Sequence, residues 1–423
     1  MSLGLCGETL SFKTLPQAWP TDTMDPSLKS ALSSLPAPDE TSQQLSLQLA
    51  DAISAEIESK GGRIPFDRFM ELALYHPGLG YYSNDLRKFG EQGDFITAPE
   101  LTPLFGHCIA RQCAEALEQL DIGSILEFGA GSGRLAADLL GELERLDRLP
   151  ERYYILELSA ALRQRQQELL QQELPSIFER IEWLDQLPES FSGVVVANEV
   201  LDAMPVSRIL IDESGIKEQY VALSDQGFYA TWDAIFTPEL QPVAETLQNR
   251  YSLPIPYETE INLRATSWIS ELSSILSGGM VLLIDYGYSG HEFYHPQRNT
   301  GTLICHYRHR THGDPLFLPG LQDITANVDF TAVAEAALAA GFDSHAFTPQ
   351  AYFLLAGGLE QLLMELELSG KEQLQQIQAI KRLTLPNEMG ERFKVLALGK
   401  GLKQQPSGFS LHQLPLKITH PPM

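Results

Sequence analysis

The chain has 423 residues and a formal net charge of −25, from 55 acidic and 30 basic side chains. This charge argues against general binding to nucleic acid or to anionic membranes, because phosphate contacts need a basic surface. It suits a basic protein partner, although acidity that only keeps the protein soluble explains the charge equally well. Hydrophobic residues make up 43% of the chain, which is enough for one large domain with insertions or for two domains.

The cysteines and the apolar runs bear on location. The four cysteines, Cys6, Cys108, Cys113 and Cys305, form no C-x-x-C pair and are too few for a disulfide framework. No apolar run reaches the roughly 18 residues of a membrane-spanning helix, and the N-terminus lacks the features of a secretion signal. We expect a cytoplasmic bacterial protein with reduced cysteines and no membrane partner.

The N-terminal part of the chain is predicted to hold an arm and a helical cap. Residues 1–40 are rich in Pro, Ser and Thr without periodicity, which predicts an extended arm. Residues 41–121 are predicted to form a helical cap with a loop that covers a cofactor. Apolar residues at helical spacing predict helices over 42–59, 66–75 and 104–120.

The stretch SILEFGAGSG, residues 124–133, is predicted to be a buried strand that runs into a glycine turn. An amphipathic helix over 134–148 follows it. Glycines let the backbone approach a ligand closely, and the N–H groups at the start of the helix are free to face that ligand. An ordinary tight turn between a strand and a helix is the alternative.

Strands and helices alternate after this turn, which predicts an α/β fold with a doubly wound, mainly parallel sheet. The domain is predicted over 122–423, with insertions at about 206–258 and 288–327. Further strands are predicted over 153–158, 180–184, 193–197, 280–287, 341–347 and 393–399. Further helices are predicted over 159–173, 238–250, 261–276 and 329–340, with two helical segments before the last strand.

The sequence patterns in and near the two predicted insertions differ from the strand–helix alternation of the rest of the domain. Alternating apolar and polar residues over 208–232 predict an antiparallel meander. LPIPYETE, residues 253–260, is predicted to be a loop, and Ser277-Gly278-Gly279 is predicted to end the helix before the fifth strand. The segment 288–327 is predicted to be rich in loops.

The glycine turn carries an acidic residue that separates two kinds of nucleotide ligand. The dinucleotide fingerprint G-x-G-x-x-G is absent, and the pattern instead places Glu127 before Gly129, Gly131 and Gly133. A carboxylate there suits a cationic ligand, such as the amino group of S-adenosylmethionine (SAM).

Ligands of such sheets lie beyond the carboxyl ends of the strands, so polar residues there are candidates for a site. Glu157 at the end of the second strand suits a bidentate grip on ribose hydroxyls, which both SAM and NAD carry. Asp185 is predicted to contact the adenine amino group or to cap a helix. Asn198 and Glu199 follow directly on a buried strand, which favours a functional role for both.

Five of the ten histidines fall between His291 and His312. H-x-x-H-x-x-H at 306, 309 and 312 invites interpretation as a metal site, but arginines interleave with the histidines and no cysteine pair or nearby carboxylate completes a ligand set. We therefore predict no metal and interpret the segment as a lid or a loop that faces the substrate.

Several of these stretches together resemble the MidA-type family of SAM-dependent methyltransferases, whose mitochondrial members assist assembly of respiratory complex I. Phe128-Gly129-Ala130 departs from the Leu-Gly-Pro of many members, and CHYRHRTH resembles the bacterial branch. The matching stretches run from about Phe69 to Phe330 in family order, with FKVLALG beyond: FMELALYHPGLGYYS, GDFITAPE with LFG, LEFGAGSGRLAADLL, YYILELS, ANEVLDAMP, YETEIN, GGMVLLIDYG and GTLICHYRHRTHGDPLFLPGLQDITANVDF.

The resemblance implies a seven-stranded, Rossmann-like methyltransferase sheet and SAM as the cofactor. For the mitochondrial branch it implies symmetric dimethylation of an arginine in a complex I subunit. The predicted cofactor-binding residues are then Thr97, Glu127, Gly129, Gly131, Gly133, Glu157, Asp185 and Asn198. The acids best placed to grip a guanidinium are Glu199, Asp202, Glu258 and Glu260, with Glu199 first.

The leading hypothesis is thus a SAM-dependent methyltransferase that acts on an arginine of a protein substrate. A second hypothesis is a SAM-binding assembly factor whose main role is to hold a partner, which the long insertion and the acidic surface motivate. A third, an NAD-dependent oxidoreductase, is disfavoured by the missing G-x-x-G spacing.

Overall fold

The computed structural model describes residues 35–84, 86, 97–120, 123–366 and 369–418. The predicted arm therefore lies almost entirely outside the described residues, as do Cys6 and the first four residues of GDFITAPE. The chain divides into two compact units. Unit 1 comprises residues 1–86, 205–261 and 303–324, and unit 2 comprises 87–204, 262–302 and 325–423.

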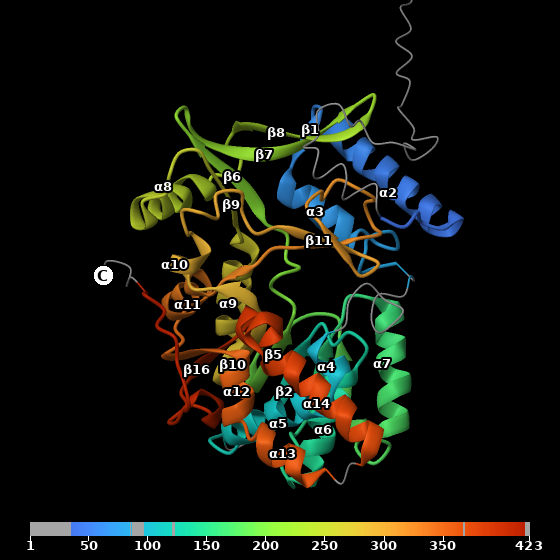
Figure 1. Ribbon diagram of the computed structural model, residues 1–423, viewed down its shortest axis with the longest axis vertical. Coiled ribbons are helices and arrows are strands. Elements are labelled where there is room, and N and C mark those ends of the chain that lie inside the picture. Colours follow the sequence, from blue (N-terminus) through green and yellow to red (C-terminus); the bar gives the residue numbers. More distant parts are fainter. Residues whose placement is uncertain (1–34, 85, 87–96, 121–122, 367–368, 419–423) are drawn as a thin grey trace, which may run out of the picture. The chain divides into compact units, whose positions relative to one another are not determined.

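Unit 2 is built on one large mixed sheet, in which seven strands follow the order β15-β16-β10-β5-β2-β3-β4 and the short β14 pairs with β10 (Figure 1). The pairs β10–β5, β5–β2, β2–β3 and β3–β4 are parallel, and β16 runs antiparallel to both β10 and β15. The predicted fold class is confirmed. The strands are β2 (Ser124–Phe128), β3 (Tyr153–Leu156), β4 (Ile181–Leu184), β5 (Phe191–Asn198), β10 (Leu276–Tyr288), β14 (Val328–Asp329), β15 (Ser344–Pro349) and β16 (Phe393–Lys400).

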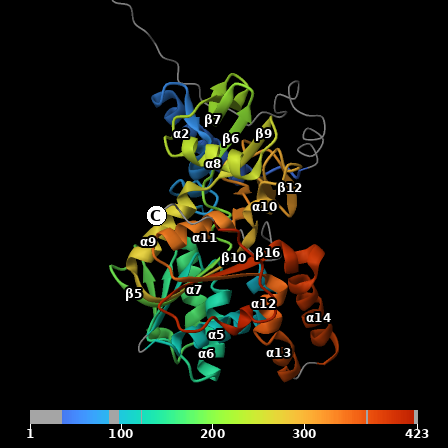
Figure 2. The same cartoon turned by 90° about the vertical axis from the view of Figure 1, so that its left-hand side faces the viewer.

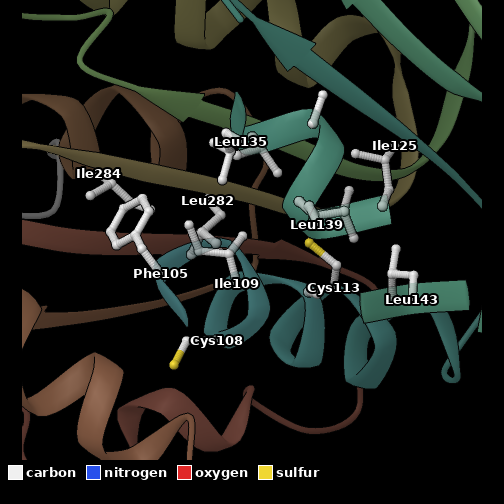
Figure 3. Packing of buried hydrophobic residues seen from close by; sticks show 14 of the residues in the cluster. Phe105, Cys108, Ile109, Cys113, Ile125, Leu135, Leu139, Leu143, Leu282 and Ile284 are labelled. Atoms are coloured by element: carbon white, nitrogen blue, oxygen red, sulfur yellow. The ribbon is translucent and has the colours of Figure 1, made fainter. Parts of the chain in front are cut away.

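Helices cover both faces of this sheet, because successive strand residues point to opposite sides. On β2, Ile125 belongs to one buried cluster and Leu126 to the other. The first cluster joins the sheet to α5, α6 and α12, and Figure 3 shows Cys113 of α5 packed among its aliphatic side chains. The second cluster joins the sheet to α9 and α11, which lie side by side (Figures 1 and 2).

The helices of unit 2 follow the predicted pattern closely. Ser159, the first residue of the predicted helix 159–173, is the N-cap of α7 and accepts a hydrogen bond from the Leu162 N–H. The described helices are α4 (Ala98–Leu101), α5 (Pro103–Leu117), α6 (Arg134–Arg145), α7 (Ala160–Glu173), α9 (Leu263–Ile275), α10 (Gly290–Phe293), α11 (Phe330–Ala339), α12 (Gln350–Ala356), α13 (Leu359–Glu365) and α14 (Gly370–Thr384).

Unit 1 contains the predicted meander. An antiparallel sheet has the order β1-β7-β6-β9, with β8 paired to β7, and a second sheet has the order β12-β11-β13. Its helices are α2 (Glu40–Ser59), α3 (Phe66–Tyr75) and α8 (Leu240–Tyr251). Its strands are β1 (Arg63–Pro65), β6 (Ser207–Asp212), β7 (Gly215–Ser224), β8 (Gly227–Ala234), β9 (Tyr257–Ile261), β11 (Ile304–Tyr307), β12 (Arg310–His312) and β13 (Asp323–Thr325).

Three local predictions are wrong. YETE of the predicted loop belongs to β9, because the prolines end at Pro256 and alternation resumes at Tyr257. Ser277-Gly278-Gly279 does not precede the fifth strand but lies within β10, where a bulge interrupts the register between Leu276 and Gly278. Three described α-helices, rather than two helical segments, lie between β15 and β16.

The predicted domain boundaries remain predictions, although the predicted cap and both insertions supply segments of unit 1. None of the helices in the described part of the chain is long and apolar enough to cross a membrane.

Candidate active site

The glycine turn lies at the carboxyl end of β2, at the centre of the parallel part of the sheet. Gly129, Gly131 and Gly133 have φ angles of +61°, +54° and +87°. These are left-handed conformations that side chains with a Cβ rarely adopt, so the spacing of the glycines is explained by the backbone itself. Gly133 also caps the start of α6. The turn therefore offers bare backbone and a helix N-terminus to a ligand.

Gln166 of α7 ties the glycine turn to the second strand. Its amide nitrogen donates to the carbonyl of Gly131 at 2.9 Å and to Glu157 Oε2 at 3.0 Å, and its amide oxygen accepts from Trp183 Nε1 at 2.9 Å. A Cβ on Gly133 would lie 3.3 Å from Gln166, so the third glycine also allows this close packing. Sequence reasoning missed Gln166, because nothing in the Gln-rich helix distinguishes it from its neighbours.

Glu157 is held in a fixed orientation beside this turn. It accepts hydrogen bonds from Gln166 and from the Ser159 N–H, the latter at 2.9 Å. Burial raises the pKa of Glu157, and these hydrogen bonds oppose the rise. The structure thus brings Glu157 to the glycine turn through Gln166, as an oriented hydrogen-bond acceptor of the kind that ribose hydroxyls need.

Glu127, the acid before the glycines, is only 2% exposed. Its Oε2 accepts a hydrogen bond from the hydroxyl of Tyr153 at 2.8 Å. Burial raises the pKa of Glu127 to about 7, against the lowering effect of the Tyr153 hydrogen bond. Its side chain is thus engaged with a strand neighbour, and its predicted contact with a cationic ligand remains a prediction.

The described end of GDFITAPE contacts the turn and the neighbouring strand within unit 2. Thr97 is the N-cap residue of α4. The Ser132 hydroxyl, in the glycine turn, donates to the carboxyl group of Glu100, and the Ala98 N–H donates to Glu199. This stretch therefore links the glycine turn to Glu199. Glu100 was absent from the predicted site residues, although the stretch that contains it was singled out.

Glu199 follows directly on β5 and is held in an unusual backbone conformation. Its φ angle is +53°, a left-handed value that is rare for residues other than glycine and that accompanies functional strain in many sites. Its carboxyl group accepts from Asn198 Nδ2 at 3.0 Å, from the Tyr286 hydroxyl at 3.3 Å and from the Ala98 N–H. Burial raises the pKa of Glu199 to about 7, and the three donors oppose the rise.

Asn198 has an orphan acceptor. Its amide nitrogen donates to Glu199, whereas its Oδ1 is buried and has no hydrogen-bond partner among the described residues. A buried oxygen without a donor is costly, which points to a ligand that supplies one. Together with the bare glycine turn and the oriented Glu157, this oxygen fits a ligand rich in hydroxyl and amino groups, such as SAM.

Asp285 lies on β10, where Ile284 pairs with Asn198 in the parallel register. It is fully buried and accepts hydrogen bonds from three backbone N–H groups, those of Leu201, Asp202 and Tyr286. Burial, with the nearby charge of Glu199, raises the pKa of Asp285 to about 8. Asp285 and Tyr286 fall within the predicted strand 280–287 but were not among the predicted site residues.

The four predicted catalytic acids fall in both units. Glu199 and Asp202 belong to unit 2, whereas Glu258 and Glu260 belong to unit 1. Within unit 1, Glu258 and Glu260 both face Arg208 of β6, at 3.3 Å and 3.6 Å. Arg208 lies 5.8 Å from the Phe66 ring and 5.9 Å from the Trp232 ring. These two glutamates are engaged with an internal guanidinium, and their predicted catalytic role remains a prediction.

Asp185 and His312 each interact with a residue outside the predicted site. The side chain of Asp185 is 87% exposed and forms an ion pair with Arg163 at 2.8 Å. His312, on β12, accepts a hydrogen bond from the Asp314 N–H at 3.3 Å, and burial lowers its pKa to about 4. Across the described ranges, no group of three or more His, Cys, Asp or Glu side chains could hold a metal ion.

Comparison with known proteins defines the class of this protein. Residues 108–348 match the family model Methyltransf_28, which is described as an S-adenosyl-L-methionine-dependent methyltransferase. The matched segment is more than half of the chain and contains the glycine turn, Glu157, Asn198-Glu199 and Asp285. The chain belongs to this family of SAM-dependent methyltransferases, and the predictions of enzyme class and cofactor are confirmed.

Two relatives of this chain are named as protein arginine methyltransferases. The chain is 30% identical over 392 residues to the mitochondrial protein arginine methyltransferase NDUFAF7 homolog of Drosophila melanogaster, covering 84% of this chain and 85% of the relative. It is 27% identical to human mitochondrial protein arginine methyltransferase NDUFAF7, covering 80% of each. The predicted family resemblance is therefore confirmed.

A solved structure matches nearly the whole chain. A COG1565 superfamily member from Burkholderia thailandensis, bound to S-adenosyl-homocysteine, has a TM-score of 0.86 and 43% sequence identity. The match covers 90% of this chain and 99% of that one. A native structure of a COG1565 protein from the same organism has a TM-score of 0.83 and 42% identity.

Proposed function

We propose that this methyltransferase transfers the methyl group of SAM to an arginine side chain of a protein substrate. The observation that carries the proposal is the Glu199 carboxyl group, held by three donors at the end of β5. An arginine side chain is always cationic in proteins and pairs best with a fixed carboxylate. The names of the relatives in fly and human support the same acceptor.

The residues around Glu199 suit an acceptor that must be oriented and must lose a proton. SAM, when bound, supplies a methyl group already activated by its sulfonium. A guanidinium is a poor nucleophile, so holding one nitrogen in line with the methyl group is the main task of the protein. Glu199 has a pKa near neutrality, so its carboxylate can also take up the proton that the guanidinium nitrogen releases.

The net charge of −25 supports a basic protein substrate, because opposite charge speeds encounter and suppresses binding to acidic competitors. We also propose a cytoplasmic location, which fractionation of cells that express a tagged chain would test.

The experiment that tests the acceptor compares proteins from cells with and without the gene. Purified enzyme and methyl-labelled SAM are added to extract of the deletion strain, and labelled peptides are identified by mass spectrometry. The proposal predicts label on arginine nitrogens in one or a few basic proteins, at sites that are methylated only in the wild type. Label on another residue type would overturn the arginine assignment.

A pull-down of partners beside the labelling experiment separates an enzyme from an assembly factor. A stable partner recovered equally well by the wild type and by Glu199→Ala, with no label transferred to any protein, would favour the partner-holding role.

A further inference from the structure

The polypeptide between β5 and the next strand is anchored from the side by one carboxyl group. Asp285 Oδ2 accepts the Leu201 N–H at 2.9 Å and the Asp202 N–H at 3.2 Å. Its Oδ1 accepts the N–H of Tyr286 at 2.8 Å. Asp285 is completely buried, so these backbone donors have no competing water.

The anchored segment is the one that carries Glu199. The Glu199 N–H donates to the carbonyl of Ile284 at 2.9 Å, directly before Asp285. Glu199 is thus fixed to β10 by its own backbone and, two residues later, by the grip of Asp285 on Leu201. A glutamate with a left-handed φ persists only where its surroundings over-determine the backbone, and these hydrogen bonds supply that constraint.

We propose that Asp285 is a positioning residue for methyl transfer, which holds the turn at 199–202 so that the Glu199 carboxylate is presented to the acceptor. The inference rests on the role proposed for Glu199 and is independent of whether the acceptor is an arginine. Tyr286 completes the arrangement, because its backbone N–H donates to Asp285 and its hydroxyl donates to Glu199.

A purely structural acceptor would not need to be a buried carboxylate so close to a second one. Two like charges in one buried region disfavour ionisation of both, and the nearby Glu199 charge contributes to the raised pKa of Asp285. Asp285 therefore takes up its proton at a higher pH than burial alone would cause. The other ionisable groups around it are Asp202 on the same turn, Tyr286, and Lys394, which pairs with Asp285 in the β10–β16 register.

The test uses the full chain with Asp285→Asn, which keeps the size of the side chain but replaces one accepting oxygen by an NH2 group that cannot accept a backbone N–H. Methyl transfer from labelled SAM is measured against increasing amounts of deletion-strain extract, and SAM affinity is measured by calorimetry. We expect the maximal rate to fall at least about fivefold, while the SAM dissociation constant stays within about threefold of the wild type.

The split between rate and affinity separates a positioning role from a structural one. Misplacing the Glu199 carboxyl group lowers the rate of methyl transfer without changing the glycine turn, whereas a general disruption of unit 2 lowers the rate and the SAM affinity together. A rate within fivefold of the wild type, or equal losses of rate and SAM affinity, would overturn the proposal. If Asp285→Asn does not fold, Asp285→Ser is analysed with the same readouts.

Asp329→Asn is the matched control. Asp329 is also a carboxylate in unit 2 that accepts two backbone N–H groups, those of Thr331 and Ala332, at the start of α11. We expect the wild-type rate and SAM affinity, and an equal loss of rate in this control would count against Asp285 as well. Absence of label with the wild type would overturn the proposed function and, with it, the role of Asp285, whereas label on a residue other than arginine would refute only the proposed acceptor.

Discussion

The glycine turn at 129–133 and the acidic turn at 198–202 lie at the ends of neighbouring strands, β2 and β5, but are built in opposite ways. The first adopts left-handed φ angles with glycines, at little strain. The second adopts a left-handed φ at Glu199, where the strain is held by hydrogen bonds from α4 and β10. The first turn exposes backbone, whereas the second presents a carboxyl group.

This difference indicates how cofactor binding and acceptor binding are divided between the two turns. A bare backbone turn can accept a cofactor closely but offers little chemistry of its own. A strained, buried carboxyl group costs stability and is retained where its charge has a use. We therefore propose that the glycine turn binds the cofactor and that the acidic turn binds the acceptor, and the following variants test that division.

Glu199→Gln should have the largest effect. Removing the charge while keeping the shape is expected to lower the rate of methyl transfer by about 1000-fold. The wild-type rate should fall as pH drops through about 7, because Glu199 is protonated below its raised pKa. Labelled SAM and extract at pH 6, 7 and 8 provide the measurement. A variant that keeps a tenth of the rate would contradict the assignment.

Gly131→Val should weaken SAM binding by about 100-fold with the fold retained, because a branched residue is strained at φ +54° and its side chain occupies the path of the cofactor. Calorimetry measures the affinity, and circular dichroism checks the fold. The matched control is Gly141→Ala in α6, where an added Cβ meets nothing within 4 Å. The control should bind SAM with wild-type affinity. Wild-type affinity of Gly131→Val would contradict the proposal that the glycine turn binds SAM.

Gln166→Leu should weaken SAM binding by about tenfold, since it removes the link between Gly131 and Glu157 without changing the volume of the side chain greatly. The unfolding free energy should fall by about 1–3 kcal/mol, because Trp183 Nε1 loses its acceptor. Gln164→Leu, on the exposed side of the same helix, serves as the control. Equal SAM affinities for the two variants would show that the link is dispensable.

Glu127→Gln tests stability more than binding. In the folded chain the pKa of Glu127 is about 7, against an ordinary value of 4.5. The stabilising contribution of Glu127 to the free energy of unfolding is therefore fully present below pH 4.5 and is lost as the pH rises through 7. Relative to the wild type, the variant should gain about 3 kcal/mol of unfolding free energy between pH 4 and pH 8, at about 1.4 kcal/mol per pKa unit. Urea denaturation at both pH values measures the difference in unfolding free energy between the variant and the wild type. A difference that is the same at both pH values would contradict the raised pKa of Glu127.

The sequence predicted one turn better than the other for a physical reason. Glycine spacing, a preceding strand and a following helix are all local, so SILEFGAGSG was sufficient to predict the strand, the glycine turn and the helix after it. The environment of Glu199 comes from Ala98 and Tyr286, which lie about 100 residues before it and 87 residues after it. Such contacts depend on strand order, which single-sequence patterns do not specify.

The mistakes in the fold have the same origin. β9 was missed because it directly follows Pro254 and Pro256, and its alternation becomes decisive only when β6 pairs with it. Glu258 and Glu260 were predicted among the acids best placed for catalysis, a role that remains a prediction, and Arg208 on that partner strand faces both. Partners on a neighbouring strand decide whether a carboxylate is available, and these partners are visible only in the folded chain.

The most direct test of the division of work is calorimetric titration of SAM into Glu199→Gln, on the same preparation whose methyl-transfer rate is measured. The assignment predicts a dissociation constant within about threefold of the wild type although the rate is nearly abolished. Loss of SAM affinity as large as that of Gly131→Val would show that the acidic turn belongs to the cofactor site and would contradict the division.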